Sequence, residues 1–259
     1  MVVSWNVNVG GGAVRVVIDR LRNGSFTDGR PVTQFALLLQ EEYRAGNAVP
    51  PSVPRGFPTP SRIAPIVKGL QREDVETVAN DEGLALFYVP SMRNGGVVRP
   101  IEDRGNAILS TLPLGDLTAI ELPVEHQRRV VVAATVHSGS WTLRLVDVHL
   151  DTALALAHGG PFAARRRQAQ TIVSAVSSTT PTLIAGDLNT WRGNGEGAVA
   201  VFQNAFPQVA QRATTTWMGF GFRADLDHVF ARGVGSIDVR RLSDRFGSDH
   251  FPLLATISF

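Results

Sequence analysis

The chain has 259 residues, of which 44% are hydrophobic, and a formal net charge of +2. It contains no cysteine, which excludes structural disulfides and thiolate metal sites, so any metal must be held by Asp, Glu, Asn or His. No apolar run approaches the roughly 20 residues needed to span a bilayer, and the first residues lack the features of a secretory signal. We expect a soluble protein that is cytoplasmic, or secreted if a signal peptide has been removed.

The first elements of the chain predict strands that end in polar residues. Residues 2–7 have a strand pattern that carries Asn6 near its end, and residues 13–21 have the apolar spacing of a helix. The continuous apolar run 35–39 predicts a buried strand, followed by an acidic pair that begins with Glu41. An acidic pair directly after a core strand costs free energy unless it reaches solvent or a cation.

The next stretch predicts a proline-rich loop between further strands. Residues 48–65 include six prolines and are expected to form a surface loop or flap. Strands are predicted at 84–89 and 106–110, with a turn at 94–96 between them. Because the strand patterns on both sides of the loop belong to one alternating series, we expect residues 1–259 to form a single domain.

The second half of the chain predicts a hairpin and then an arginine-bearing helix. Residues 130–136 and 142–150 pair naturally as antiparallel strands, and the second of them places His149 near its end. Residues 163–176 have helical spacing, with the three arginines 165–167 in the first turns. Arginine is suited to bidentate phosphate contacts, although the excess of arginine over lysine also fits a bias in genome composition.

The stretch 181–190 delivers Asp187 and Asn189 to the end of a buried strand. Residues two apart on a strand point to the same side, so both side chains are expected to face one ligand. A carboxylate beside a carboxamide offers oxygen ligands and hydrogen-bond donors that suit a divalent cation and a phosphate oxygen. The structural alternative is a strand that ends in an Asx-type turn.

After a short helix at 196–206, strands are predicted at 226–231, 234–242 and 251–259. Six strand ends in the whole chain then carry polar residues suited to chemistry: Asn6, Glu41, His149, Asp187 with Asn189, Asp227 with His228, and Asp249 with His250. Layered sheet folds gather their sites at strand ends, whereas each residue alone also fits an ordinary polar strand end. His228 is expected to point away from Asp227 and to be structural, and His126 and His137 lie in no motif.

These residues resemble the metal-dependent endonuclease/exonuclease/phosphatase superfamily, which includes pancreatic-type deoxyribonuclease, abasic-site endonucleases, bacterial sphingomyelinases and inositol polyphosphate phosphatases. Seven motifs carry the resemblance and occur in the order of the family: SWNV at 4–7, LQE at 39–41, RGNAILS at 104–110, VDVHL at 146–150, GDLN at 186–189, LDHVF at 226–230 and SDHFPL at 248–253. They extend over most of the chain, so the resemblance covers the whole presumed domain.

The resemblance implies a site for a divalent cation. Glu41 resembles the principal ligand of Mg²⁺, with Asn6 and Asp249 close to the same metal, and Mn²⁺ or Ca²⁺ would suit the same oxygen ligands. Glu42 becomes the ligand instead if the register of its strand shifts by one residue. Asn106 is expected to contact the substrate phosphate or to shape the site.

The resemblance also implies the catalytic groups. Asp187 and Asn189 resemble the pair that orients the attacking water and holds the scissile phosphate. His250 resembles the general acid-base or phosphate-polarising histidine, and Asp227 the carboxylate that fixes its ring. His149 resembles the second histidine of the nuclease and sphingomyelinase branches, where abasic-site enzymes carry other residues, which makes an abasic-site activity less suitable here.

The fold implied by the resemblance is a four-layer α/β/β/α sandwich, in which two mixed sheets pack face to face with helices outside. About ten or eleven strands are predicted from the periodicity itself. The implied function is a metal-dependent phosphoesterase that hydrolyses phosphodiester bonds, with nucleic acid as the favoured substrate. A lipid head group or another small phosphate ester is the alternative, and a non-catalytic binding protein on this fold is the third. No obligate protein partner is evident.

Overall fold

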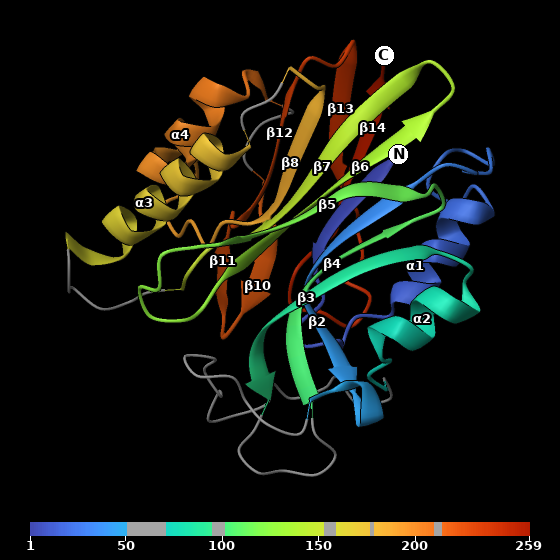
Figure 1. The fold of residues 1–259 in the computed structure, drawn as a ribbon, viewed down its shortest axis with the longest axis horizontal. Coiled ribbons are helices and arrows are strands. Elements are labelled where there is room, and N and C mark those ends of the chain that lie inside the picture. Colours follow the sequence, from blue (N-terminus) through green and yellow to red (C-terminus); the bar gives the residue numbers. More distant parts are fainter. Residues whose placement is uncertain (51–70, 95–101, 153–158, 177–178, 210–213) are drawn as a thin grey trace.

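Two six-stranded β-sheets pack face to face in the middle of the molecule (Figure 1). The computed structural model describes residues 1–50, 71–94, 102–152, 159–176, 179–209 and 214–259. The first sheet has the strand order β13-β14-β1-β2-β4-β3, with β1 (Val2–Asn6), β2 (Ala36–Ala45), β3 (Ala85–Asn94), β4 (Glu102–Ser110), β13 (Ser236–Arg241) and β14 (Leu253–Ser258). The second has the order β5-β6-β7-β8-β12-β9, with β5 (Leu114–Glu121), β6 (Val130–Ser138), β7 (Trp141–His149), β8 (Thr182–Asp187), β9 (Gln208–Val209) and β12 (Asp227–Arg232).

Both sheets are mixed, and helices cover their outer faces (Figure 1). β1 with β2 and β7 with β8 are parallel pairs, and the other neighbours are antiparallel. The helices are α1 (Val14–Arg22) and α2 (Val75–Asp81) on the first sheet, and α3 (Gly160–Ala175) and α4 (Gly197–Ala205) on the second. Three apolar cores result, one between the sheets and one under each helix pair. The expected α/β/β/α sandwich is confirmed.

The alternation of side chains along β1 decides which residues enter the space between the sheets. Val3 and Trp5 pack under the helices of the first sheet, whereas Val2 belongs to the core between the sheets. Because successive side chains of a strand point to opposite faces, Asn6 also faces the second sheet. The space between the sheets is therefore apolar where β1 begins and polar where it ends.

Most elements predicted from apolar periodicity are confirmed, including α1 and the β6–β7 hairpin. The prediction missed α2, β5, β9 and the short hairpin of β10 (Trp217–Gly219) and β11 (Phe222–Ala224), so the described residues hold 14 strands instead of ten or eleven. Two short 3-10 helices were also missed, η1 (Gly46–Ala48) and η3 (Gly193–Gly195). Most of the loop at 48–65 and of the turn at 94–96 lies outside the described residues, and the single domain remains a prediction.

One missed element carried a recognisable signal. Asp74 precedes α2, and its side chain accepts hydrogen bonds from the backbone N–H groups of Glu76 and Thr77, as a capping Asp does.

Among the described residues, no helix is long and apolar enough to cross a membrane.

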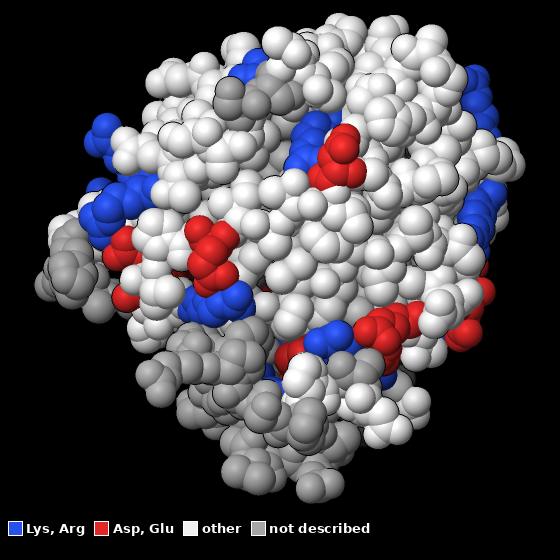
Figure 2. All heavy atoms as spheres, in the orientation of Figure 1, with Lys and Arg blue, Asp and Glu red and all other residues white. Residues whose placement is uncertain are grey.

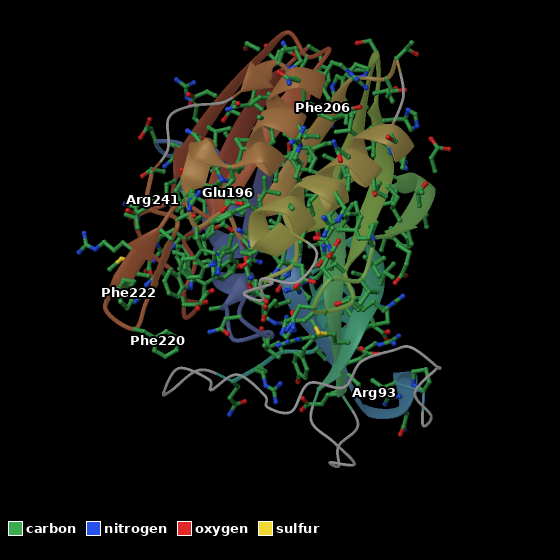
Figure 3. All side chains as sticks on the ribbon, turned by 90° about the vertical axis from the view of Figure 1, so that its left-hand side faces the viewer. Arg93, Glu196, Phe206, Phe220, Phe222 and Arg241 are labelled. Atoms are coloured by element: carbon green, nitrogen blue, oxygen red, sulfur yellow. The ribbon has the colours of Figure 1, made fainter. Side chains whose placement is uncertain are left out.

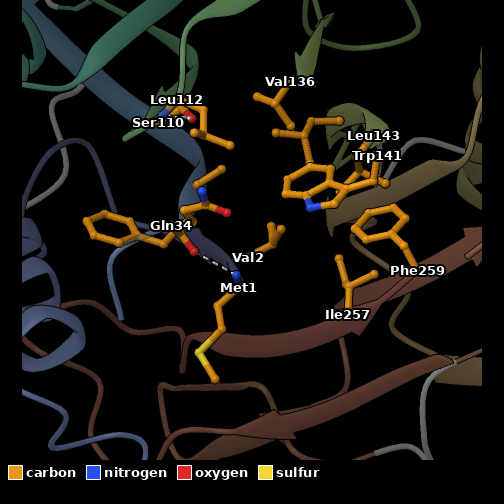
Figure 4. A pocket seen from close by; sticks show the side chains of 13 residues that line it. Met1, Val2, Gln34, Ser110, Leu112, Val136, Trp141, Leu143, Ile257 and Phe259 are labelled. Carbon is orange, nitrogen blue, oxygen red and sulfur yellow. Dashed lines mark hydrogen bonds between the residues drawn. The ribbon is translucent and has the colours of Figure 1, made fainter. Parts of the chain in front are cut away.

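An apolar cavity of about 200 Å³ lies between the sheets where β1 and β7 begin (Figure 4). Val2 and Trp141 contribute to its wall, and the Trp141 ring stacks on Phe259 with the ring centroids 4.6 Å apart. From Val2 to Asn6 the strand advances about 13 Å. The cavity is therefore separate from the polar end of the sandwich, where the candidate site lies.

Candidate functional site

Three neighbouring strands of the second sheet place titratable residues in one row. In the parallel pairing of β7 with β8, His149 lies opposite Asp187, and in the antiparallel pairing of β8 with β12, Asp187 lies opposite Asp227. Residues opposite one another on adjacent strands point to the same face of a sheet. The row therefore faces the first sheet, and all three side chains are buried.

Asp187 is where side chains from both sheets meet. Its Oδ2 accepts a hydrogen bond of 3.0 Å from Nδ2 of Asn6 on the first sheet. The same oxygen lies 3.5 Å from Nε2 of His149 and 3.7 Å from Nε2 of His250. One carboxylate oxygen thus faces two imidazoles and an amide, which is an arrangement suited to proton transfer.

The pKa values of His250 and Asp187 move in ways that favour opposite roles. Nδ1 of His250 lies 2.8 Å from Oδ2 of Asp227. Burial lowers the pKa of His250, but the attraction of Asp227 and Asp187 outweighs it and raises that pKa to about 10. Burial also raises the pKa of Asp187 to about 7, although the attraction of His250 opposes the shift. His250 is therefore protonated at neutral pH, next to a carboxylate that gains and loses a proton there.

His149 has the opposite charge state from His250. Burial, together with repulsion from Arg129, lowers the pKa of His149 well below its usual value. Nη1 of Arg129 lies 3.2 Å from Nδ1 of His149. Because arginine offers only donors, Nδ1 of His149 accepts, and the ring proton is on Nε2, which faces Asp187.

Asn189 fixes Asp187 through the backbone. Its N–H donates to Oδ1 of Asp187 at 2.8 Å, and its Nδ2 donates to the carbonyl of Leu150 at 3.0 Å. The φ of Asn189 is 51°, a left-handed conformation that Asn tolerates better than most residues. Asn189 thus lies beyond the end of β8, contacts Asp187 through its backbone N–H, and gives its side-chain amide to the protein backbone; that both side chains face one ligand stays a prediction.

A β-bulge directs Glu41 toward the site. The pairing of β2 with β4 shifts between Leu39 and Glu42, and Glu41 has a φ of 58°. Bulges re-aim side chains in this way. Oε2 of Glu41 lies 3.4 Å from Nη1 of Arg104, and Glu41 also attracts the buried Arg129.

Glu42, the alternative ligand, lies elsewhere. It is almost fully buried, and burial, with further contributions from Asp74 and Glu73 near α2, raises its pKa to about 8. Glu42 thus belongs to the surroundings of α2, on the opposite side of the sheet from Arg129.

Asp249 lies beside the row and has an aromatic partner. Nε1 of Trp217 donates to its Oδ2 at 2.8 Å, and the hydroxyl of Ser248 lies 3.5 Å from its Oδ1. The carboxylates of Glu41 and Asp249 and the amide oxygen of Asn6 are the hard oxygen donors that Mg²⁺ prefers, and Mg²⁺ needs only one or two protein carboxylates. The chemistry of these donors suits a divalent cation, although the amide oxygen of Asn6 already accepts the backbone N–H of Asn8 at 3.0 Å; their role as ligands stays a prediction.

A second group of possible ligands was not expected. Among the described residues, Asp187, Asp227 and His250 each offer a ligand atom within 4.8 Å of the others. Oδ1 of Asp227 is buried and has no hydrogen-bond partner among the described groups. The resemblance assigns these residues to catalysis. Their ligand atoms are close enough for a cation, but His250 would first have to lose its proton, because only a neutral imidazole binds a metal.

Asn106 lies in a buried polar layer beneath the row. Its Nδ2 donates to the carbonyl of Asp147 at 3.3 Å, and Nε2 of Gln40 lies 2.5 Å from Oδ1 of Asp147. These contacts join the two sheets. Burial raises the pKa of Asp147 well above its usual value, which favours a protonated carboxyl group.

The arginine triplet corrects one interpretation of the sequence. Arg165 is buried and forms a bidentate ion pair with Glu196, and Arg167 pairs with Glu125. These two arginines are therefore engaged within the protein, and only Arg166 is exposed. Arg129, which lies in no motif, is the buried cation that reaches the site instead. No pattern in the sequence indicated Arg129, because its contact with His149 depends on the fold.

Three further histidines of the described residues lie outside the row. Nε2 of His228 bonds to the hydroxyl of Thr190 at 2.7 Å, and its ring stacks on Phe230. His137 is exposed and bonds to Thr142, and His126 bonds through its backbone N–H to Asp151.

On the face shown in Figure 2, basic and acidic side chains lie in small mixed groups, so charge alone defines no binding surface there.

The comparison with protein families gives one match over nearly the whole chain. The sequence profile of the Endonuclease/Exonuclease/phosphatase family matches residues 3–250. The chain belongs to this family. A comparison with curated protein sequences found no match.

Several solved structures have the same fold as the chain at low identity. An endonuclease/exonuclease/phosphatase family protein from Leptotrichia buccalis is 12% identical, with a TM-score of 0.66 and coverage of 100% of this chain and 99% of that one. The human Nocturnin catalytic domain with bound sulfate anion is 15% identical, with a TM-score of 0.58 and coverage of 99% and 94%. A 3'-5' exonuclease from Neisseria meningitidis is 15% identical, with a TM-score of 0.57 and coverage of 100% and 99%.

Proposed function

We propose that the protein is a divalent-metal-dependent phosphodiesterase that hydrolyses nucleic acid. The observation that carries this proposal is the position of Asp187 Oδ2, 3.5 Å and 3.7 Å from the Nε2 atoms of His149 and His250. A phosphodiester is an anion that must be attacked by water, and the site offers both a proton acceptor and cationic donors. Membership of a family of phosphoesterases supports the same reaction class.

Each residue of the row has a defined part in the reaction. Asp187, with a pKa raised by burial to about 7, accepts a proton from the attacking water as the water oxygen bonds to phosphorus. The bond from phosphorus to the leaving oxygen breaks, and the leaving oxygen takes a proton from solvent. Protonated His250 donates its Nε2–H to a phosphoryl oxygen, and Asp227 holds the ring in that orientation. His149 stays neutral and, with Asn189, keeps Asp187 in place.

Glu41, Asn6 and Asp249 would hold the cation, with Mg²⁺ preferred and Mn²⁺ or Ca²⁺ accepted by the same oxygen ligands. When bound, a divalent cation neutralises charge on the phosphoryl oxygens. Asn106 is assigned a site-shaping role, because its amide nitrogen already donates to Asp147.

Nucleic acid is the favoured substrate because Arg104 and Arg129 lie at the site and one similar structure is described as a 3'-5' exonuclease. A lipid head group or another small phosphate ester is the alternative. Plasmid DNA, RNA, sphingomyelin and bis(p-nitrophenyl) phosphate, each with Mg²⁺, Mn²⁺ or EDTA, separate the two. Cleavage of DNA or RNA that EDTA abolishes supports the proposal, and activity confined to sphingomyelin or the small ester overturns the choice of substrate.

Removing the side chain of Asp187 or His250 tests the chemistry. We expect His250→Ala and Asp187→Ala each to lower kcat for bis(p-nitrophenyl) phosphate at least about a hundredfold, because general acid-base catalysis contributes ~10²–10⁴ in rate. The matched control is His137→Ala, which removes an exposed histidine and should leave kcat within about twofold. Circular dichroism verifies that each variant is folded. A folded Asp187→Ala or His250→Ala variant with wild-type kcat would exclude the assigned roles.

A further inference from the structure

The hairpin of β10 and β11 is fixed beside the candidate site. The backbone N–H of Met218 donates to the carbonyl of Asp249 at 3.0 Å, and the N–H of Phe251 donates to the carbonyl of Thr216 at 2.7 Å. Trp217 adds the side-chain bond to Asp249. The base of the hairpin is thus bonded on both sides of His250, so its strands extend outward from the site.

Aromatic side chains form a row along one face of this hairpin. Gly219 pairs directly with Phe222, so both point to the same face as Trp217, two residues before Gly219. A Cβ atom at Gly219 would come within 2.5 Å of the Trp217 ring, so that ring lies along Gly219 toward Phe222. Trp191, two residues after Asn189, packs edge-on against Trp217 with the ring centroids 5.1 Å apart. The aromatic row of Trp191, Trp217 and Phe222 therefore leads from the site to the tip.

The tip itself carries a phenylalanine in an unfavourable place. Phe220 and Gly221 form the two-residue turn and have φ values of 50° and 82°, a pattern for which Asn-Gly is the preferred sequence. A bulky side chain in the left-handed region is strained. Phe220 is 90% exposed and Phe222 70% exposed (Figure 3), so neither ring offsets the strain by burial. Strain and exposure together indicate a partner outside the chain.

Two arginines flank the aromatic row. Arg192 follows Trp191, and Arg223 follows Phe222; both are exposed, and within the described part of the chain neither forms an ion pair with a carboxylate. The guanidinium of Arg192 lies 4.1 Å from the centroid of the Phe162 ring. Trp217 is buried within the row, whereas Trp191 and Phe222 are exposed. Exposed rings near cations are the features that bind the bases and phosphates of single strands.

We propose that the β10–β11 hairpin binds single-stranded polynucleotide next to the scissile phosphate, with bases stacked on Phe222 and Phe220. This inference rests on the proposed phosphodiesterase function. A lipid bilayer is less suitable, because inserting Phe222 into hydrocarbon would take the adjacent Arg223 with it.

The double variant Phe220→Asn/Phe222→Ser tests the proposal without weakening the turn, since Asn favours the left-handed conformation. We expect its Tm to be no lower than that of the wild type. Its affinity for oligothymidylate, measured by fluorescence anisotropy in EDTA, should fall at least about fivefold, the lower bound for losing one stacked base. The value of kcat/KM for oligothymidylate, divided by kcat/KM for bis(p-nitrophenyl) phosphate, should decrease by the same factor as the affinity.

The matched control is Leu117→Ser, which removes an exposed apolar side chain from β5 and should not change either measurement. For Arg192→Ala/Arg223→Ala we expect the slope of log affinity against log salt to decrease by about 0.7 for each lost phosphate contact. Unchanged oligothymidylate binding by the Phe220→Asn/Phe222→Ser variant overturns the proposal. The proposal is also overturned if the Phe220→Asn/Phe222→Ser variant loses binding to phosphatidylcholine vesicles but keeps its binding to oligothymidylate.

The failure of the hairpin proposal is distinguishable from failure of the proposed function. If the wild type cleaves oligothymidylate and the double variant cleaves it equally well, only the hairpin proposal is wrong. If the wild type hydrolyses bis(p-nitrophenyl) phosphate but neither binds nor cleaves polynucleotide, the choice of substrate and the hairpin proposal are both wrong.

Discussion

Asp187 and His250 lie in one buried site, yet burial and neighbouring charges give them different protonation states at neutral pH. Burial raises the pKa of Asp187 to about 7, and the carboxylates around His250 raise the pKa of His250 to about 10. Pairs of titratable groups whose pKa values are pushed apart supply an acid and a base at the same pH. At the scale of single residues, the proposed chemistry therefore depends on desolvation as much as on residue type.

His228 provides a test of burial through stability. Burial lowers its pKa from 6.5 to about 4, so the folded protein keeps the ring neutral while the unfolded chain protonates it. Above pH 6.5 the ring is neutral in both states, so the full free energy of unfolding is present. Below pH 6.5 the unfolded chain binds a proton that the folded protein does not, so the free energy of unfolding decreases as the pH falls toward 4. The loss from this residue is up to ~3 kcal/mol.

We expect His228→Gln to reduce the decrease in the free energy of unfolding between pH 7 and pH 4.5, because glutamine does not titrate. Urea denaturation of wild type and variant at both pH values measures the difference. His137→Gln, at an exposed histidine, is the control and should follow the wild type. An equal decrease in wild type and His228→Gln would contradict the prediction.

At the scale of elements, α3 is attached to the segment before α4 by a buried ion pair. Nε and Nη2 of Arg165 lie 2.8 Å and 2.9 Å from the two carboxylate oxygens of Glu196, and both side chains are almost fully buried. Glu196 also accepts the backbone N–H of Arg192. The pair therefore positions the loop that carries Trp191, a member of the aromatic row.

Breaking this pair should cost more than replacing it. We expect Arg165→Met or Glu196→Leu alone to lower the free energy of unfolding by about 3–5 kcal/mol, because each leaves an uncompensated buried charge. The double variant Arg165→Met/Glu196→Leu should lose much less than the sum of the two. Urea denaturation of the four proteins measures the coupling.

The control for this cycle is Arg167→Met, whose pair with Glu125 is partly exposed, with 39% of the arginine side chain accessible. Its removal should cost about 1 kcal/mol or less. Additive losses at Arg165 and Glu196 would show that the two side chains do not stabilise the fold as a pair.

At the scale of the whole molecule, the two sheets meet across an apolar middle and a polar end. The bond from Asn6 to Asp187 and the contact of Gln40 with Asp147 cross between the sheets at the polar end. The proposed ligands Asn6, Glu41 and Asp249 lie at β1, in β2 and just before β14, which are neighbours in the first sheet. A cation bound there finds its site only in the folded protein, so binding should stabilise the entire fold.

We expect Mg²⁺ at about 100 times its Kd to raise the Tm, because binding to the folded state alone contributes about 2.7 kcal/mol, or roughly 5–10 °C for a chain of this size. Glu41→Gln should reduce this shift, and EDTA should abolish it. Differential scanning fluorimetry measures the shift, with Asp238→Asn, at an exposed residue of β13, as the control. A full Mg²⁺ shift in Glu41→Gln would exclude Glu41 as a ligand.

Much of the fold and part of the site are determined by local sequence patterns. Apolar periodicity predicted β1, α1 and the β6–β7 hairpin, because each period buries one face of one element. The apolar run before Asp187 predicted that a strand ends there, but Asn189 lies beyond β8 with a φ of 51°. Alternation predicted that His228 points away from Asp227. Short elements with few apolar residues, such as β10 and β11, leave no such period and were missed.

Only the tertiary structure decided which of these residues touch. Asn6 and Asp187 are 181 positions apart, and their contact requires two sheets to pack with their polar ends together. The bulge that directs Glu41 toward Arg104, the approach of Arg129 to His149, and the pairing of Arg165 with Glu196 likewise depend on distant partners. The sequence by itself determined which strand ends carry polar groups. Packing between the sheets decided which groups meet, and burial there sets their charge.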